Sequence, residues 1–103
     1  MLETFTIAMF AGHLGETFSI HLESGTMLEA ELIEVTSLSA RSAQGTEIQR
    51  PRAPFSLVFR SPAHTRLVQR VYQMAHPAIG TFEIFLVPIG LDAQGLRCEA
   101  IFT

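Results

Sequence analysis

Two apolar segments separated by turn residues close the chain. Residues 81–87 are rich in β-branched and aromatic side chains, and residues 97–102 alternate in the same way. Between them, residues 90–95 supply two glycines and an aspartate, which are typical of turns. Pro88 cannot donate to a β-ladder, so it marks a strand end or an edge position. The pattern predicts an antiparallel hairpin at the C-terminal end.

Matching the faces of this hairpin predicts its register. Phe82 opposite Phe102 and Leu86 opposite Cys98 give one wholly apolar face. The other face is mixed, with three apolar positions among charged ones: Phe85, Val87 and Ile101. An antiparallel sheet with one wet side should alternate cleanly, so these three side chains need a cover. The cover is expected to be either the N-terminal segment or a neighbouring subunit.

The N-terminal segment predicts a short helix. Phe5, Met9 and Phe10 share one helical face, and Gly12 ends the element. We expect a helix over residues 4–11 that lies across one opening of the sheet.

Strict alternation over residues 16–23 and again from residue 26 predicts a second hairpin. A three-residue loop over 23–25 sets Ile20 opposite Leu28 and Phe18 opposite Ala30, and it places Gly25 where a positive φ is needed. A two-residue loop would mix the apolar face with charge. The alternation slips at Ile33, which indicates a bulge.

The middle of the chain is less regular. Residues 39–54 are polar and turn-rich, with a tip at 44–45 and a short edge strand expected over 46–50. Two prolines bracket residues 55–61, whose alternating phenylalanines and leucine predict a strand. Residues 61–76 fit either a helix capped by Ser61 or a strand, and propensity favours the helix.

These elements predict one domain over residues 1–103, mainly β. We expect about six antiparallel strands in a small sandwich or incomplete barrel, with the short N-terminal helix. The length suits a single core, and the 48% hydrophobic content excludes a disordered chain.

Charge and composition exclude several classes of protein. A net charge of −3 argues against general nucleic-acid binding. All basic residues are arginines, and Arg41, Arg50 and Arg52 fall in one polar stretch that either contacts an anion or acidic partner or is a solvated loop. No apolar run is long enough to span a bilayer, and no signal peptide is recognised. A single cysteine fits a reducing compartment, so we expect a cytoplasmic protein.

Two groups of residues are candidates for chemistry. His21 and Glu23 share a strand face, with His13 and Glu29 as further metal ligands, but neither a cysteine pair nor an HExxH motif occurs. The predicted register instead makes His21 and Glu29 a surface ion pair. Glu29 and Glu31 are paired carboxylates that could perform acid–base work, but their face is expected to be wet.

No motif for a nucleophile surrounds Ser56, Ser61 or Cys98, and Cys98 is expected to be a small core residue. His64 follows two residues after Pro62, and His76 lies next to Pro77 and is expected to anchor a turn through a backbone hydrogen bond. We therefore expect no cofactor, no metal and no enzymatic activity.

Four motifs together resemble a bacterial family of small domains of unknown function: PFSLVFR over 54–60, HPAIG over 76–80, FLVPIG over 85–90 and EAIF over 99–102. The resemblance runs from Phe18 to Phe102. It implies a mostly β fold in which residues 67–76 are extended, and it implies a phage-tail-like or surface-fibre setting. That family commonly has tyrosine at the position of Cys98, which fits a packing role there. The resemblance implies no activity, substrate or cofactor.

We expect a structural or assembly module that self-associates or binds another protein through Phe85, Val87 and Ile101. The alternative is a small barrel that carries an apolar ligand in its interior.

Overall fold

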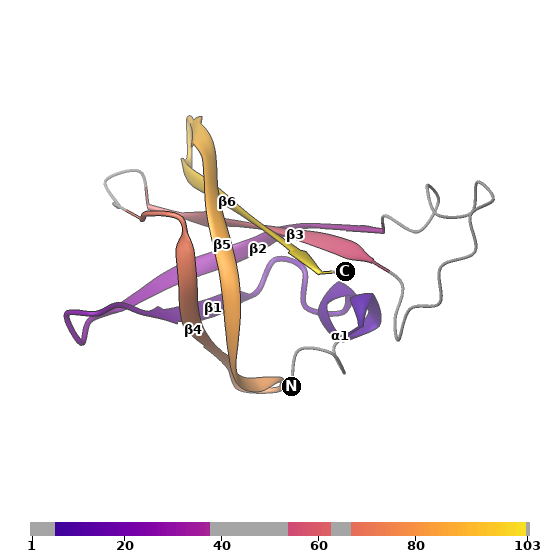
Figure 1. The fold of residues 1–103 in the computed structure, drawn as a ribbon. Coiled ribbons are helices and arrows are strands. Elements are labelled where there is room, and N and C mark those ends of the chain that lie inside the picture. Colours follow the sequence, from indigo (N-terminus) through magenta and orange to yellow (C-terminus); the bar gives the residue numbers. More distant parts are fainter. Residues whose placement is uncertain (1–5, 38–53, 63–66, 103) are drawn as a thin grey trace.

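The computed structural model describes residues 6–37, 54–62 and 67–102. The expected arginine stretch, its tip and its edge strand lie outside these residues, as does His64. One helix and six strands follow in chain order (Figure 1): α1 (Ile7–Ala11), β1 (Thr17–His21), β2 (Met27–Ser37), β3 (Phe55–Ser61), β4 (Arg70–His76), β5 (Gly80–Asp92) and β6 (Gly95–Phe102).

The six strands close into an antiparallel barrel in the order β1–β2–β3–β6–β5–β4. Pairing of β1 with β4, through Ser19 opposite Ala75 and His21 opposite Gln73, completes the ring. The predicted mainly β fold with about six strands and one short helix is therefore confirmed. Closure pairs strand edges that would otherwise be open to other chains. No helix in the described parts of the chain has the length and apolar character to cross a membrane.

The first hairpin has the predicted register. Phe18 lies opposite Ala30 and Ile20 opposite Leu28. Gly25 has φ 88°, and its N–H donates to the carbonyl of Leu22. The pairing of β2 with β3 shifts between Leu32 and Glu34, so the bulge expected near Ile33 is also confirmed.

The segment before Pro77 is strand β4, and the helix favoured by propensity is wrong for residues 70–76. Tyr72, Met74 and His76 point inward and are buried, with the alternation of a strand. β4 fills the gap between β1 and β5, and without it the barrel would stay open. Long-range pairing therefore overrides the local helical preference.

The closing hairpin exists, but its predicted register is wrong by two residues. Val87 lies opposite Glu99 and Pro88 opposite Cys98. The reason is a bulge between Pro88 and Gly90, after which β5 continues to Asp92 and turns through two residues only. Because the error is an even number, every side chain keeps its predicted face. Pro88 lies beyond the part of β5 that pairs with β4, so its missing N–H breaks no bond there.

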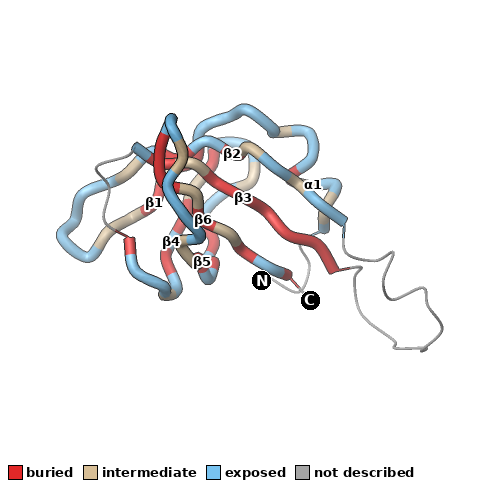
Figure 2. The backbone as a smooth tube through the Cα atoms, turned by 90° about the horizontal axis from the view of Figure 1, so that it is seen from above, coloured by how far each residue is buried: buried red, intermediate tan, exposed pale blue. Residues whose placement is uncertain are grey.

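Inward-facing side chains from all six strands form the core. Figure 2 marks the buried positions along the backbone in red. Phe10 of α1 is fully buried with them, and its ring lies 5.9–6.3 Å from the rings of four phenylalanines on four strands: Phe18, Phe55, Phe82 and Phe102. The helix therefore inserts Phe10 into one mouth of the barrel. It does not cover the outer face of the closing hairpin.

Cys98 is a core residue, as the sequence predicted. Its side chain is 1% exposed, and burial raises the pKa of the thiol to about 11. At neutral pH the thiol is therefore protonated and a poor nucleophile.

Candidate functional site

The outer faces of β4, β5 and β6 carry an exposed apolar surface. Val71 lies directly opposite Phe85, and their side chains are 53% and 47% exposed. Val87 follows two residues after Phe85, opposite Glu99, and Ile101 follows two residues after Glu99 with 58% exposure. We call these four residues the outer apolar face. The structure thus brings together the three side chains that the sequence singled out and adds Val71.

This surface concentrates the exposed apolar side chains of the molecule. Eight large hydrophobic residues are exposed in the described part of the chain, and five of them lie on β4, β5 or β6. Alternation along β5 explains the arrangement, because Phe82, Ile84 and Leu86 fill the barrel while the residues between them point outward. Exposed apolar side chains that gather on neighbouring strands are typical of a site that binds another protein.

Next to this surface, an ion pair covers the outside of β3. Arg97 of β6 donates to Glu34 of β2 at 3.1 Å, so this bridge crosses the intervening strand. Val58, which points outward from β3 opposite Glu34 and Glu99, is only 4% exposed. The apolar outer positions of β3 are therefore covered within the chain, unlike those of β4 and β5.

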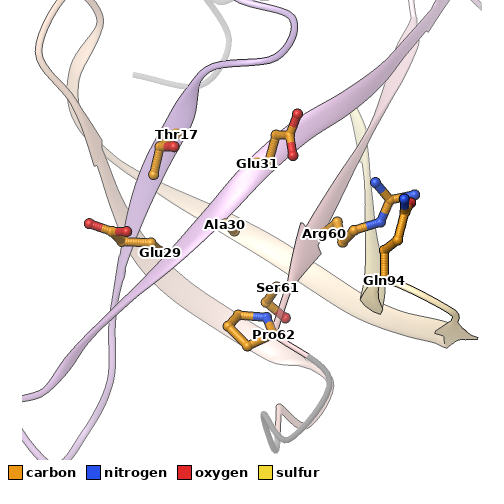
Figure 3. A pocket seen from close by; sticks show the side chains of 8 residues that line it. All are labelled: Thr17, Glu29, Ala30, Glu31, Arg60, Ser61, Pro62 and Gln94. Atoms are coloured by element: carbon orange, nitrogen blue, oxygen red, sulfur yellow. The ribbon is translucent and has the colours of Figure 1, made fainter.

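The carboxylates Glu29 and Glu31 line a shallow pocket of about 290 Å³ on the outside of the barrel (Figure 3). The remaining lining is mostly polar: Thr17, Ala30, Arg60, Ser61, Pro62 and Gln94. Neither carboxylate forms an ion pair within the described ranges, and the predicted pair between His21 and Glu29 is not among the bridges found there. Both carboxylates are exposed, whereas acid–base catalysis by a pair of carboxyl groups needs one of them removed from water.

Arg60, which is opposite Glu31, is engaged elsewhere. Its guanidinium donates to Asp92 at 3.0 Å. Asp92 also accepts the backbone N–H groups of Gln94 and Gly95, and the Gln94 bond is the main cause that lowers the pKa of its carboxyl. Asp92 therefore fixes the β5–β6 turn and the end of β3 together.

A cluster that the sequence did not predict lies near the mouth that α1 occupies. His13, Glu16 and His76 converge, and one oxygen of Glu16 lies 2.8 Å from a ring nitrogen of each histidine. His76 is buried at the end of β4 and lies 60 residues from Glu16 in sequence. Only the turn-anchoring role of His76 had a signal in the sequence. It is confirmed, because the N–H of Ala78 donates to Nδ1 of His76 at 3.0 Å.

Three donor atoms at this spacing meet the minimum for a metal site, but the hydrogen bonds do not fit one. A ligating histidine normally donates its second ring N–H to an acceptor. Nδ1 of His76 instead faces the N–H of Ala78, so the ring proton of neutral His76 must be on Nε2, the atom that a metal would need. The arrangement is that of hydrogen bonds to a carboxylate. The candidate ligands that the sequence offered, His21, Glu23, His13 and Glu29, do not converge among the described residues.

The hydroxyls considered as nucleophiles are both buried in strand β3. Ser61 Oγ donates to the carbonyl of Leu96, and Ser56 lies opposite Thr36 and Ile101. Neither has a histidine partner in the described ranges. The described residues therefore offer an apolar surface as the most distinct feature for function.

Comparison with known proteins gives one match. Residues 5–102 match the family described as Domain of unknown function (DUF6916). No curated protein and no solved structure matches the chain. Because the match covers nearly the whole sequence, the chain belongs to this family of uncharacterised domains.

Proposed function

We propose that this chain is a non-enzymatic assembly module that packs its outer apolar face against a second copy of itself. The observation that carries the proposal is the set of outward apolar side chains on three adjacent strands: Val71, Phe85 and Ile101 are about half exposed, and Val87 is partly exposed. Their burial in an interface would remove apolar surface from water, which is the main driving force of most protein association. A phage-tail-like or surface-fibre system is a setting in which such a module would act.

The packed interior supports this proposal over the alternative of a ligand carrier. Phenylalanines from four strands surround Phe10, and the rings of Phe55 and Phe102 stack at 4.7 Å. The pocket of Figure 3 lies on the outside of the barrel and not in its core. Its lining is too polar for an apolar ligand. The buried, protonated thiol and the exposed positions of Glu29 and Glu31 support a role without catalysis. The free thiol also favours synthesis in a reducing cytoplasm before assembly.

We expect Phe85→Asp to abolish self-association while the domain stays folded. The new carboxylate would lie in the middle of the outer apolar face, where burial without a partner is strongly unfavourable. In the monomer, position 85 is nearly half exposed, so we expect the free energy of unfolding to change by less than about 1 kcal/mol. Light scattering with size exclusion measures the mass, and thermal unfolding measures the stability.

Met27→Asp is the matched control. Met27 is 58% exposed on the β1–β2 hairpin, away from the outer apolar face, so this variant should keep the mass of the wild type. An unchanged mass for Phe85→Asp would refute the proposed interface. A lower oligomeric mass in both variants would show that added charge, not the outer apolar face, controls association.

A further inference from the structure

We propose that His13, Glu16 and His76 form an acid-sensitive hydrogen-bonded cluster, which we call the latch. It holds helix α1, with its buried Phe10 side chain, in the mouth of the barrel. The latch joins two segments that are far apart in sequence: the turn between α1 and β1, and the end of β4 before the β4–β5 turn. It does not depend on the outer apolar face or on self-association.

The positions of the protons follow from the hydrogen bonds. Ala78 N–H occupies Nδ1 of His76, so Nε2 of the neutral ring carries the proton and donates it to Glu16 Oε1. Nδ1 of His13 points at the same oxygen and donates to it. An ionised carboxylate accepts both bonds, and such charge-assisted bonds are about twice as strong as neutral ones.

Backbone hydrogen bonds connect the latch to helix α1. The N–H of His13 donates to the carbonyl of Phe10, and Glu16 N–H donates to His13. Glu16 is also tied to β2, because its carbonyl accepts the N–H of Leu32. The chain from Phe10 to Glu16 is thus fixed at both ends, so a change at Glu16 acts directly on the position of Phe10.

Among the described residues, few other charges lie near the latch. Residues 7–11 of α1 are uncharged, and the adjacent charged position on β2 is Glu31, opposite Thr17. No ion pair found in the described ranges joins Glu31 to either histidine. On β4 itself, the preceding residues Gln73 and Ala75 are uncharged. On β5, Gly80 and Thr81 lie opposite His76 and Ala75 and are also uncharged. Glu16 is therefore the counter-charge that the structure provides for both rings, whose centroids are 4.5 Å apart.

Acid weakens the latch at Glu16. Protonation of this carboxyl removes the negative charge that accepts a hydrogen bond from each histidine ring, so both charge-assisted bonds are lost. This change releases the ends of the turn on which α1 depends.

The pH window follows from Glu16. Hydrogen bonds from His76 first, and then from His13, hold the pKa of this carboxyl below its ordinary value of 4.5. A carboxyl with a lowered folded-state pKa stabilises the folded state fully above its unfolded pKa, and this contribution is lost as the pH falls through the folded value. The latch is therefore closed at neutral pH and opens below about pH 4.5.

Amide hydrogen exchange of residues 7–16 and 76–80 tests the latch, after correction for the intrinsic pH dependence of exchange. In the wild type we expect protection of both segments to fall together as the pH is lowered below 4.5, before the strands exchange. Glu16→Gln removes the charge and keeps the shape. It should raise exchange of both segments about fivefold or more at pH 7 and abolish the pH dependence, because two charge-assisted bonds become neutral ones.

Glu29→Gln, a change at an unpaired carboxylate, is the control and should behave as the wild type. Nitrogen NMR of the imidazole rings adds a readout that a merely structural change would not move: His76 should carry its proton on Nε2 at pH 7. Exchange in Glu16→Gln equal to that of the wild type would overturn the latch. So would a proton on Nδ1 of His76, or a stoichiometric change of both histidine signals on adding Zn²⁺, since a metal site would then explain the cluster.

Discussion

Phe10→Ala is expected to lower the free energy of unfolding by about 3–5 kcal/mol, the usual loss for a buried phenylalanine. Phe10 is the side chain by which α1 enters the barrel, and four phenylalanines of four strands surround it. Its removal would leave a cavity that the closed ring of strands cannot easily fill by moving inward. Since small domains are stable by about 5–15 kcal/mol, a loss of this size is a large part of the total.

Chemical denaturation at pH 7 measures this loss. Leu14→Ala is the control in the same turn, because Leu14 is 50% exposed and its truncation should change the stability by less than about 0.5 kcal/mol. If Phe10→Ala does not fold, Phe10→Leu should still fold and lose less than about 2 kcal/mol, because it stays apolar. A loss below about 1 kcal/mol for Phe10→Ala would contradict the insertion of α1 into the core.

Gly95→Ala is expected to lower the free energy of unfolding by about 2–5 kcal/mol, from two separate causes. Gly95 begins β6 with φ +154°, a conformation that other residues rarely adopt. In addition, a Cβ at this position would lie 2.1 Å from the backbone oxygen of Ser61, so the end of β3 or the β5–β6 turn must shift. Both segments are held in place by the Arg60–Asp92 pair, which resists such a shift.

Gly90→Ala separates the two causes. Gly90 has nearly the same φ, +152°, but a Cβ there would meet nothing within 4 Å. This variant should therefore lose only the conformational part, about 1–3 kcal/mol, and the excess loss in Gly95→Ala measures the collision with Ser61. Equal losses in the two variants, measured by the same denaturant titration, would contradict the close approach of β6 to β3.

The sequence predicts the fold best where the information is local. In the first hairpin, two alternating segments are joined by a short loop with one glycine, and matching the apolar faces is enough to fix the register. In the closing hairpin the same argument identifies the faces correctly but misses the bulge at Pro88–Gly90. A bulge adds a residue to one strand without a clear change in composition, so alternation alone cannot locate it.

Strand β4 and the latch could not be derived from local patterns for a different reason, although the family resemblance correctly implied an extended segment at β4. The local pattern of residues 70–76 fits a helix, and the strand is chosen because β1 and β5 offer paired edges on both sides. His13, Glu16 and His76 meet only after the barrel closes, and no spacing along the chain connects them. The outer apolar face was predictable, because its position on the strands follows from alternation, whereas its exposure depends on where α1 lies.

The most direct test of the central claim is the solution mass of the wild-type protein, measured by light scattering over a hundredfold range of concentration. We predict a defined oligomer that persists on dilution, as expected when the outer apolar face is buried between copies. A monomer at every concentration would contradict self-association through this face.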